Sequence, residues 1–237
     1  MNSFELAESV RYSEDVKLPY IDLKFDHSKE YESHLAMSSL KVSKEITPEI
    51  FNSFLEACNS LNVDINIVKA YITSSPEIQA SCVSFSRENC ILTLTSKIIN
   101  LLNFDEIKFV IGHELGHFLL GHNLEAQSLS LESYIKKRAQ EISVDRIGLL
   151  ACKDINVATK AIIKCLSGLD ENYLKFDLKV FLNQLKQKSS ENINFEQFST
   201  HPSFILRTKS LLRFSLSDPY QKIINSSSGT DINEIDL

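Results

Sequence analysis

Two histidines and a glutamate near the middle of the chain have types and spacing suited to chemistry at a metal ion. The stretch reads His113-Glu114-Leu115-Gly116-His117. Residues four apart lie one above the other on a helix, so both imidazoles can reach the same ion. Glu114 then lies beside the pair, where it can reach a water molecule at the ion without binding the ion itself. Two ligands and a general base on one helix are the mechanical content of the HExxH pattern.

The neighbouring residues predict that this helix belongs to the core. Ionisable side chains on a core helix are costly unless a metal or a partner satisfies them, which favours the metal interpretation. The alternative is that His113 and His117 are hydrogen-bonded core histidines and Glu114 lies at the edge, since short patterns also occur by chance. The apolar residues around the motif are Phe109, Val110, Ile111, Phe118 and Leu119.

A catalytic zinc ion takes three protein ligands and leaves the fourth position to water, so a third ligand is needed. Glu141 is favoured, because the chain between it and His117 is long enough for a turn and a return along a second helix. Asp145 follows on the same face and is suited to accept the remaining N–H of a ligand histidine. Glu125 and Glu132 are alternative ligands, although neither has an acid four residues further on. Otherwise Glu141 and Asp145 would belong to a solvated helix face.

Two other arrangements are excluded. On a continuous helix His122 would lie roughly 140° around from His117, facing away from it. The metzincin pattern requires glycine and histidine at the positions that Leu120 and Asn123 occupy here.

Helix signals dominate the second half of the chain. Asn103 and Glu106 have the spacing of a capping box, which opens a helix to about Leu120, and Gly121 is a suitable stop. Another helix begins with proline in its first turn, at Thr47-Pro48-Glu49. Further helices are expected at 97–102, 131–152, 155–167, 171–187 and after Thr200-His201-Pro202-Ser203.

Three strand candidates, at 63–72, 78–85 and 90–95, predict a small sheet that is antiparallel in part. The expected fold is α+β and predominantly helical, with a small mixed or antiparallel sheet beside the active-site helix and a helical C-terminal half. We expect residues 1–46 to form an N-terminal extension with short irregular elements. Residues 47–225 should form one domain, and the polar residues 226–237 a disordered tail.

Composition favours an ordinary globular protein, with 43% hydrophobic and 24% charged residues. A formal charge of -6 with no extended basic cluster gives no reason to expect nucleic-acid binding. No signal peptide or membrane-spanning run is visible, and the five cysteines include no CxxC pair. The expectation is a soluble, cytoplasmic protein with free thiols.

Three segments together resemble the zinc metallopeptidases that include HtpX and the CAAX prenyl proteases, family forty-eight of the metallopeptidases. The first is residues 105–117 with Gly121-His122, and the second is residues 141–150, which resemble the family's ExxxD helix. The third is Ser199-Thr200-His201-Pro202-Ser203 with Arg207. All three occur in the family's order, which is much more specific than HExxH alone.

The resemblance implies a gluzincin with one zinc ion, bound by His113, His117 and Glu141. It implies that Glu114 is the general base and acid. It also implies that Asp145 orients a ligand histidine by accepting that residue's remaining N–H.

The resemblance also implies that His201 and Arg207 lie near the cleft, where they stabilise the oxyanion or brace Glu141. The plainer alternative for His201 is a residue at a helix start.

In this family a substrate-binding edge strand precedes the active-site helix. The corresponding stretch is Ile78-Gln79-Ala80-Ser81-Cys82, to which an extended peptide could add through main-chain hydrogen bonds. The chain departs from the family pattern in three ways. It has no visible transmembrane helix, Gln79-Ala80-Ser81-Cys82 replaces an Asn-Ala-Phe-Ala-like strand, and Val144 stands where alanine is usual.

The expected activity is zinc-dependent endopeptidase cleavage of unfolded or extended protein segments, by water that the metal activates. A peptide or protein substrate is the expected partner. The alternatives are a zinc-bearing module that grips peptides without cleaving them, in the manner of a chaperone, and a latent enzyme in which His201 or another side chain takes the fourth metal position.

Overall fold

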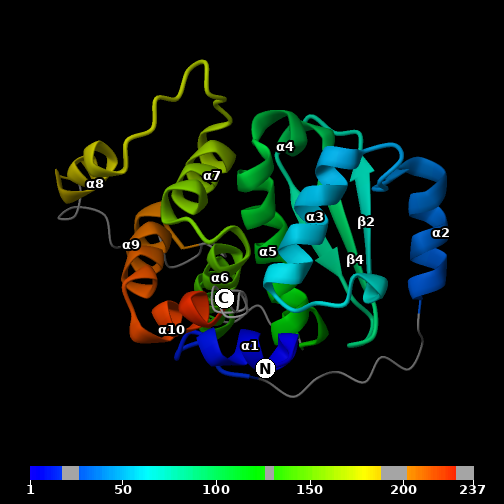
Figure 1. Ribbon diagram of the computed structural model, residues 1–237, viewed down its shortest axis with the longest axis horizontal. Coiled ribbons are helices and arrows are strands. Elements are labelled where there is room, and N and C mark those ends of the chain that lie inside the picture. Colours follow the sequence, from blue (N-terminus) through cyan, green and yellow to red (C-terminus); the bar gives the residue numbers. More distant parts are fainter. Residues whose placement is uncertain (18–26, 126–130, 188–201, 228–237) are drawn as a thin grey trace, which may run out of the picture.

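The computed structural model describes residues 1–17, 27–125, 131–187 and 202–227. The fold is predominantly helical and contains one small sheet, as the sequence predicted. Figure 1 shows helix α5 (Phe104–Leu120) near the centre, between the sheet on one side and α6 (Leu131–Cys152) on the other. This central position makes α5 the element that touches both halves of the molecule.

The sheet has four strands in the order β1-β2-β4-β3. β2 (Val68–Thr73) and β4 (Cys90–Thr95) are parallel, while β1 (Leu40–Lys41) and β3 (Ala80–Val83) pair antiparallel with their neighbours. β3 therefore lies at one end of the described sheet. The sequence predicted a mixed or antiparallel sheet, and the parallel pairing of β2 with β4 shows that it is mixed.

The predicted strand at 63–72 begins later than its alternating pattern suggested. Ile65–Ile67 form a short 3-10 turn, η1, instead. The side chain of Asp64 accepts a hydrogen bond from the backbone N–H of Asn66, which stabilises the turn in place of an extended chain. β3 is likewise shorter than the predicted 78–85.

The two faces of the sheet are covered by different helices. On one face, Val68 and Leu92 belong to the main core, which also contains the buried residues of α3 (Pro48–Ser60) and α5. On the other face, Tyr71 and Ile91 pack against Leu35 of α2 (Ser28–Ser38). Figure 1 shows α2 on the far side of the sheet from α3 and α5.

The ends of α5 follow from local chemistry. Asn103 and Glu106 form the predicted capping box, with both hydrogen bonds present. Glu106 is fully buried and also pairs with buried Lys164, whose Nζ lies 2.8 Å from Glu106 Oε2. At the other end Gly121 takes the left-handed conformation, with φ of 73°, and stops the helix.

Small residues allow α5 and α6 to approach closely. A Cβ added to Gly116 would lie 3.0 Å from the Cβ of Val144, and one added to Gly148 would lie 2.8 Å from the Phe109 ring. Ordinary side chains at these positions would force the helices apart. This close approach of the two helices allows a side chain of α6 to lie next to the histidines of α5.

The first ten residues are more regular than predicted. Asn2 and Glu5 form a capping box at the start of α1 (Ser3–Val10), and Leu6, Ala7 and Val10 belong to the main core. The expectation of irregular structure was wrong here because it overlooked this capping box. The division into an extension and a domain at residue 46 stays a prediction.

Most other helices agree with the sequence. The described ones are α4 (Ser96–Leu101), α7 (Ile155–Ser167), α8 (Leu178–Gln187), α9 (Phe204–Ser215) and α10 (Asp218–Ser227). The helix predicted from 171 begins only at Leu178, and residues 171–173 form a turn. α9 is capped by Ser203. The disordered tail was predicted from 226, but Ser226 and Ser227 belong to α10, so the prediction was wrong for these two residues, and 228–237 lie outside the described residues.

Within the described residues, no helix is both long enough and apolar enough to cross a lipid bilayer.

Candidate metal centre

The histidines of α5 and a glutamate of α6 converge on one point. His113 and His117 lie on the same helix face, with ring centroids 5.3 Å apart. Glu141 faces them from α6, with one carboxylate oxygen 3.6 Å from His113 Nε2 and the other 3.5 Å from His117 Nε2. One ligand atom from each of the three lies within 4.8 Å of the others.

The spacing fits a divalent cation. Tetrahedral ligands about 2.1 Å from a zinc ion are about 3.4 Å apart, close to the observed nitrogen–oxygen separations. Two imidazoles and one carboxylate are also a donor set that zinc accepts. Among the described residues, this is the one cluster of histidine, cysteine, aspartate and glutamate side chains that could hold a metal ion. Burial of the Glu141 carboxylate would cost folding free energy if no positive charge lay nearby.

His113 is supported from behind by an aspartate and an arginine. Its Nδ1 lies 3.0 Å from Asp145 Oδ1. Arg207 of α9 donates two hydrogen bonds to the same carboxylate, from Nε at 2.8 Å and from Nη2 at 2.6 Å. Burial alone would raise the pKa of Asp145, but the charge of Arg207 and the hydrogen bonds from Arg207 and His113 lower it overall. Asp145 therefore stays ionised and can fix the orientation of the His113 ring.

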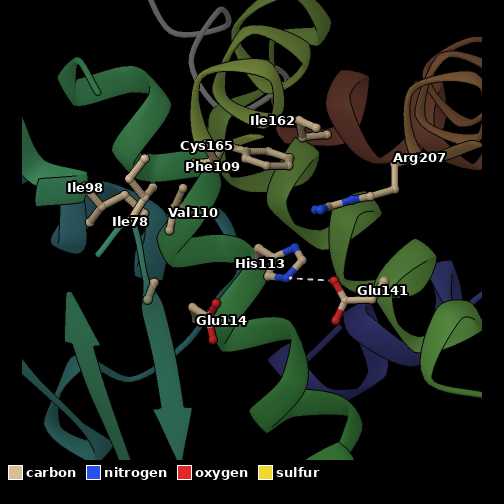
Figure 2. Close-up of a pocket in the computed structure, with 11 residues that line it drawn as sticks. Ile78, Ile98, Phe109, Val110, His113, Glu114, Glu141, Ile162, Cys165 and Arg207 are labelled. Carbon is tan, nitrogen blue, oxygen red and sulfur yellow. Dashed lines mark ion pairs between the residues drawn. The ribbon is translucent and has the colours of Figure 1, made fainter. Parts of the chain in front are cut away.

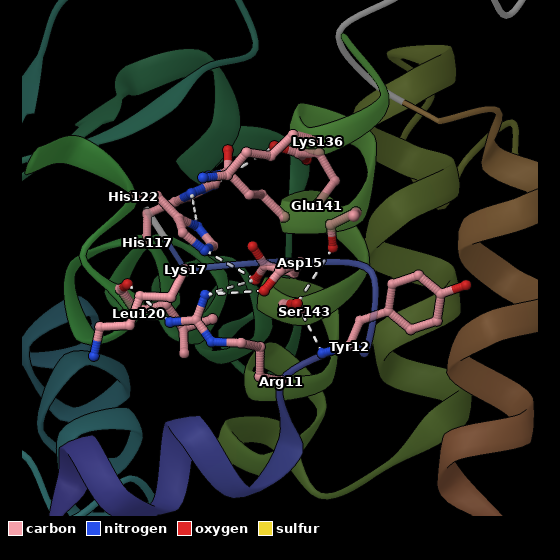
Figure 3. Close-up of polar contacts among 12 residues, drawn as sticks. Arg11, Tyr12, Asp15, Lys17, His117, Leu120, His122, Lys136, Glu141 and Ser143 are labelled. Carbon is pink, nitrogen blue, oxygen red and sulfur yellow. Dashed lines mark hydrogen bonds and ion pairs between the residues drawn. The ribbon is translucent and has the colours of Figure 1, made fainter. Parts of the chain in front are cut away.

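His117 is supported through a second imidazole. Its Nδ1 lies 3.0 Å from His122 Nδ1, and His122 Nε2 lies 3.0 Å from Asp15 Oδ2 (Figure 3). His122 is in the short 3-10 helix η2 (His122–Leu124), because the left-handed turn at Gly121 redirects the chain. The prediction that His122 faces away from His117 assumed that α5 continues past Gly121, and this prediction was wrong. His122 is still absent from the ligand cluster found among the described residues.

The charges around His117 and His122 act in opposite directions. Burial alone would lower the pKa of His117, but a hydrogen bond and the charge of Glu141, with the charge of Glu114, raise it overall. The pKa of His122 is lowered, chiefly by burial. The negative charges of Glu141 and Glu114 thus favour a protonated His117, and the same negative charges attract a cation. His122 stays neutral.

Glu114 opens onto a cleft between the candidate metal-binding residues and the edge of the sheet. The cleft has a volume of about 440 Å³. Its floor carries the ligand residues and Glu114, and its wall is the strand predicted to bind substrate. The lining residues along this wall are Ile78, Gln79, Ala80, Ser81 and Cys82.

The backbone of this wall is only partly paired with β4. Thr95 N donates to Gln79 O at 3.0 Å, so Gln79 directs its main-chain groups toward β4. By the alternation of an antiparallel ladder, Ala80 and Cys82 direct theirs away from β4, toward the cleft. The carbonyl of Cys82 accepts a hydrogen bond from Asn123 Nδ2 at 2.9 Å.

A smaller apolar pocket of about 150 Å³ adjoins Glu114 on the His113 side (Figure 2). Glu141 and Arg207 lie at its polar side. Figure 2 shows both on the side of the pocket opposite Ile78, Ile98 and Val110, with Ile162 close to Arg207. The apolar lining residues are Ile78, Ala80, Ile98, Phe109, Val110 and Ile162, and Cys165 completes the wall.

The structure brings together most of the predicted site residues, and it separates the alternatives for the third ligand. Glu125 is buried but lies 2.6 Å from Lys136 Nζ and accepts a hydrogen bond from Gln140. The side chain of Glu132 and all of His201 lie outside the described residues, so the predicted role of His201 stays a prediction. Glu141 is the acid that faces both histidines.

Sequence reasoning missed Asp15 and the contact of His122 with His117. No local signal marks Asp15, because its partner stands 107 positions away in the chain. The Gly121-His122 pair was part of the family resemblance, and that was the available signal for His122.

Comparison with known proteins supports the same interpretation. The family model described as peptidase family M48 matches residues 49–137, a stretch that contains α5 and ends before Glu141. The plastoglobule-localized metallopeptidase 48 of Arabidopsis thaliana chloroplasts is 24% identical in an alignment of length 218 that covers 79% of this chain and 62% of that protein. A protease HtpX homolog of Helicobacter acinonychis is 25% identical in an alignment of length 194 that covers 62% of this chain and 61% of the relative. No solved structure gives a significant match.

These matches and the histidine–glutamate cluster indicate a relationship to the metalloproteases. Among these, the chain is similar to the M48 metallopeptidases, and the resemblance that the motifs indicated is confirmed. The chain spans about three fifths of the length of the curated relatives it matches first.

Proposed function

We propose that the chain is a single-zinc endopeptidase of the gluzincin type that cleaves extended protein segments. The observation that carries this proposal is the convergence of His113, His117 and Glu141 at ligand spacing, on the floor of a cleft that also contains Glu114. A zinc ion there would supply Lewis-acid activation of water and of the scissile carbonyl.

The protein's own residues would then perform the proton transfers. Glu114 lines both the cleft and the apolar pocket without belonging to the ligand cluster, which suits a general base that takes a proton from the attacking water. The same carboxyl group would return the proton to the leaving amine. Arg207 lies at the pocket wall, where its charge can brace Glu141 and face a developing oxyanion.

The wall of the cleft suits a substrate in extended form. The N–H and C=O of Ala80 and the N–H of Cys82 point toward the cleft, so a peptide can add beside β3. Asn123 already engages the Cys82 carbonyl, which limits this pairing to a short stretch centred on Ala80. Gln79 and Ser81 would contribute by holding β3 against β4.

The apolar pocket adds a preference for an apolar side chain next to the cleaved bond. A cavity of about 150 Å³ lined by aliphatic and aromatic side chains is large enough to take up benzene in another protein. Here a side chain up to the size of phenylalanine could therefore enter beside Glu114.

The test is proteolysis by the Glu114→Gln variant, compared with wild type on a proteome-derived peptide library. We expect the variant to keep its zinc and to lose activity by about 10²–10⁴-fold. Glu125→Gln is a matched control, because Glu125 is a buried glutamate near the site that pairs with Lys136, accepts from Gln140 and lies outside the ligand cluster. Undiminished cleavage by Glu114→Gln would refute the role of Glu114.

The same library separates a peptidase from a module that only grips peptides. Binding of extended peptides by the zinc-loaded wild type with no cleavage would overturn the endopeptidase proposal in favour of that alternative.

Two further features belong to this proposal. We propose that the peptidase domain spans 47–225, the part of the chain that contains α5, α6 and the strand that lines the cleft. We also propose a cytoplasmic, reducing location, which the five free cysteines support.

A further inference from the structure

The N-terminal segment reaches the metal centre through a buried chain of hydrogen bonds. Asp15 contacts His122, and His122 contacts His117, with each heavy-atom separation 3.0 Å. Asp15 is 1% exposed and His122 is 8% exposed. Figure 3 shows the three side chains in a row that ends at the ring of His117. Water therefore does not compete with these contacts.

Only one arrangement of protons satisfies this chain together with a metal at His117 Nε2. A metal-binding nitrogen needs its lone pair, so the proton of the neutral His117 ring is on Nδ1 and is donated to His122 Nδ1. His122 then carries its own proton on Nε2 and donates it to the Asp15 carboxylate. The contacts thus select the His117 tautomer that binds metal.

Asp15 is itself held in place by charge and by the neighbouring backbone. Arg11 Nη1 lies 3.2 Å from Asp15 Oδ2. The same guanidinium bonds to Glu8 and donates from Nη2 to the carbonyl of Leu120 at 3.1 Å, at the C-terminal end of α5. Arg11 therefore ties the aspartate to the helix that carries His117.

The segment that carries Asp15 is also docked on α6. Tyr12 N donates to Ser143 Oγ at 3.0 Å, and Arg146 Nη1 donates to the carbonyl of Val10 at 3.1 Å. The Arg146 guanidinium also lies over the Tyr12 ring, 5.1 Å from its centroid. These contacts fix the backbone on the approach to Asp15 against the helix that supplies Glu141.

We propose that His122 and Asp15 are positioning residues of the metal centre, and that the N-terminal segment completes this centre by orienting His117. The proposal rests on the proposed function only in that His113, His117 and Glu141 bind a divalent metal. It does not require the chain to cleave peptides.

The experiment measures zinc affinity with zinc alone, by competition with a chromophoric chelator. It uses the full chain with Glu114→Gln as background, so that self-digestion cannot interfere. We expect His122→Phe, which keeps a ring but has no acceptor, to weaken zinc binding by about 10–100-fold. Asp15→Asn should weaken it less, by about tenfold or below, because one imidazole separates it from His117.

The double variant tests whether the two residues act through one another. If they do, Asp15→Asn should have little further effect on zinc affinity once His122→Phe is present. Glu56→Gln, at an exposed glutamate paired with Lys108, serves as the control and should bind zinc within about twofold of the background. Substitution of cobalt for zinc adds a second readout, because an altered His117 orientation changes the visible absorption of the bound cobalt.

Folding is monitored by the urea midpoint of the metal-free variants, and His122→Leu, which is smaller and also has no acceptor, replaces His122→Phe if that variant does not fold. Unchanged zinc affinity and cobalt spectra in folded His122 variants would overturn the proposal, as would independent, additive losses in the double variant. If instead the Glu114→Gln background binds no zinc while it is folded, the metal site itself fails, which is a different result.

Discussion

The two histidines of the metal centre are supported by the same kinds of residue in different arrangements. His113 contacts Asp145 directly, and Arg207 holds that aspartate with two hydrogen bonds. His117 reaches Asp15 only through His122, and Arg11 lies against that aspartate. We call these the direct arm and the relayed arm.

The arms differ in where their residues come from. The direct arm is built from α5, α6 and α9, and its carboxylate belongs to the helix that supplies Glu141. The relayed arm takes its aspartate and arginine from the segment after α1, at the opposite end of the chain from α9. One short pattern on α6 can therefore provide both a ligand and a support, whereas the second support depends on how the N-terminus folds back.

The largest expected effect comes from the residue that both arms share. Glu141 faces both histidines, so Glu141→Ala should remove stoichiometric zinc binding however well the arms are formed. Elemental analysis after dialysis measures this, with Glu125→Ala as the matched variant. Full zinc occupancy in Glu141→Ala would assign the third ligand elsewhere.

A second prediction compares the arms directly. Asp145→Asn should weaken zinc binding by nearly 100-fold, and Asp15→Asn by about tenfold or less, because Asp145 touches its histidine and Asp15 does not. Chelator competition on the two purified variants gives the ratio. Equal losses of zinc affinity would show that His122, which lies between Asp15 and His117, does not weaken the effect of Asp15 on His117.

The third prediction concerns acid. The pKa values of Asp15 and Asp145 are both held below the ordinary 3.8, so ionisation of each carboxylate stabilises the fold above that pH. This contribution is lost as the pH falls through the lowered value. Each Asp→Asn variant, freed of metal, should therefore be about 1–3 kcal/mol less stable than wild type near neutrality and should approach wild type in strong acid.

Urea unfolding at several pH values with a chelator present tests this acid response. Asp145→Asn should show the larger gap near neutrality, because it leaves Arg207 without its carboxylate partner. A gap that stays constant from neutrality into strong acid would contradict the assignment of either aspartate.

The smallest expected effect concerns the preference for one substrate side chain over another. Arg207 of the direct arm lines the apolar pocket, whereas no residue of the relayed arm does among the described lining residues. Ile162→Val should enlarge the pocket by one methyl group and shift the preference between leucine and phenylalanine peptides by about tenfold. Ratios of kcat/KM measure the shift, and zinc affinity should stay unchanged.

Asp145 of the direct arm could be predicted from sequence because its signals are local, whereas Arg207 was expected near the cleft from the family resemblance. Asn103 and Glu106 mark the start of α5, Gly121 marks its end, and helical spacing places Asp145 on the face of Glu141. Each signal lies within one element, where periodicity and capping chemistry determine the structure.

The relayed arm could not be predicted, because nothing local connects Asp15 with His122. Their contact depends on the turn at Gly121 and on the docking of the N-terminal segment, which are tertiary features. The strand predicted from 63 failed for a related reason. A side-chain hydrogen bond from Asn66 N to Asp64 stabilises a turn there, and hydrophobic alternation does not register such a bond.

The amide of Asn123 has a consequence for how the chain behaves among other copies of itself. The unpaired N–H and C=O groups of an edge strand can form hydrogen bonds with a strand of any other chain. Nonspecific pairing of this kind leads to aggregation. By occupying the Cys82 carbonyl, Asn123 shortens the part of β3 that can accept a newcomer. Under the proposed function, this contact leaves a short open edge for one substrate segment and shortens the edge on which strands of other copies could pair.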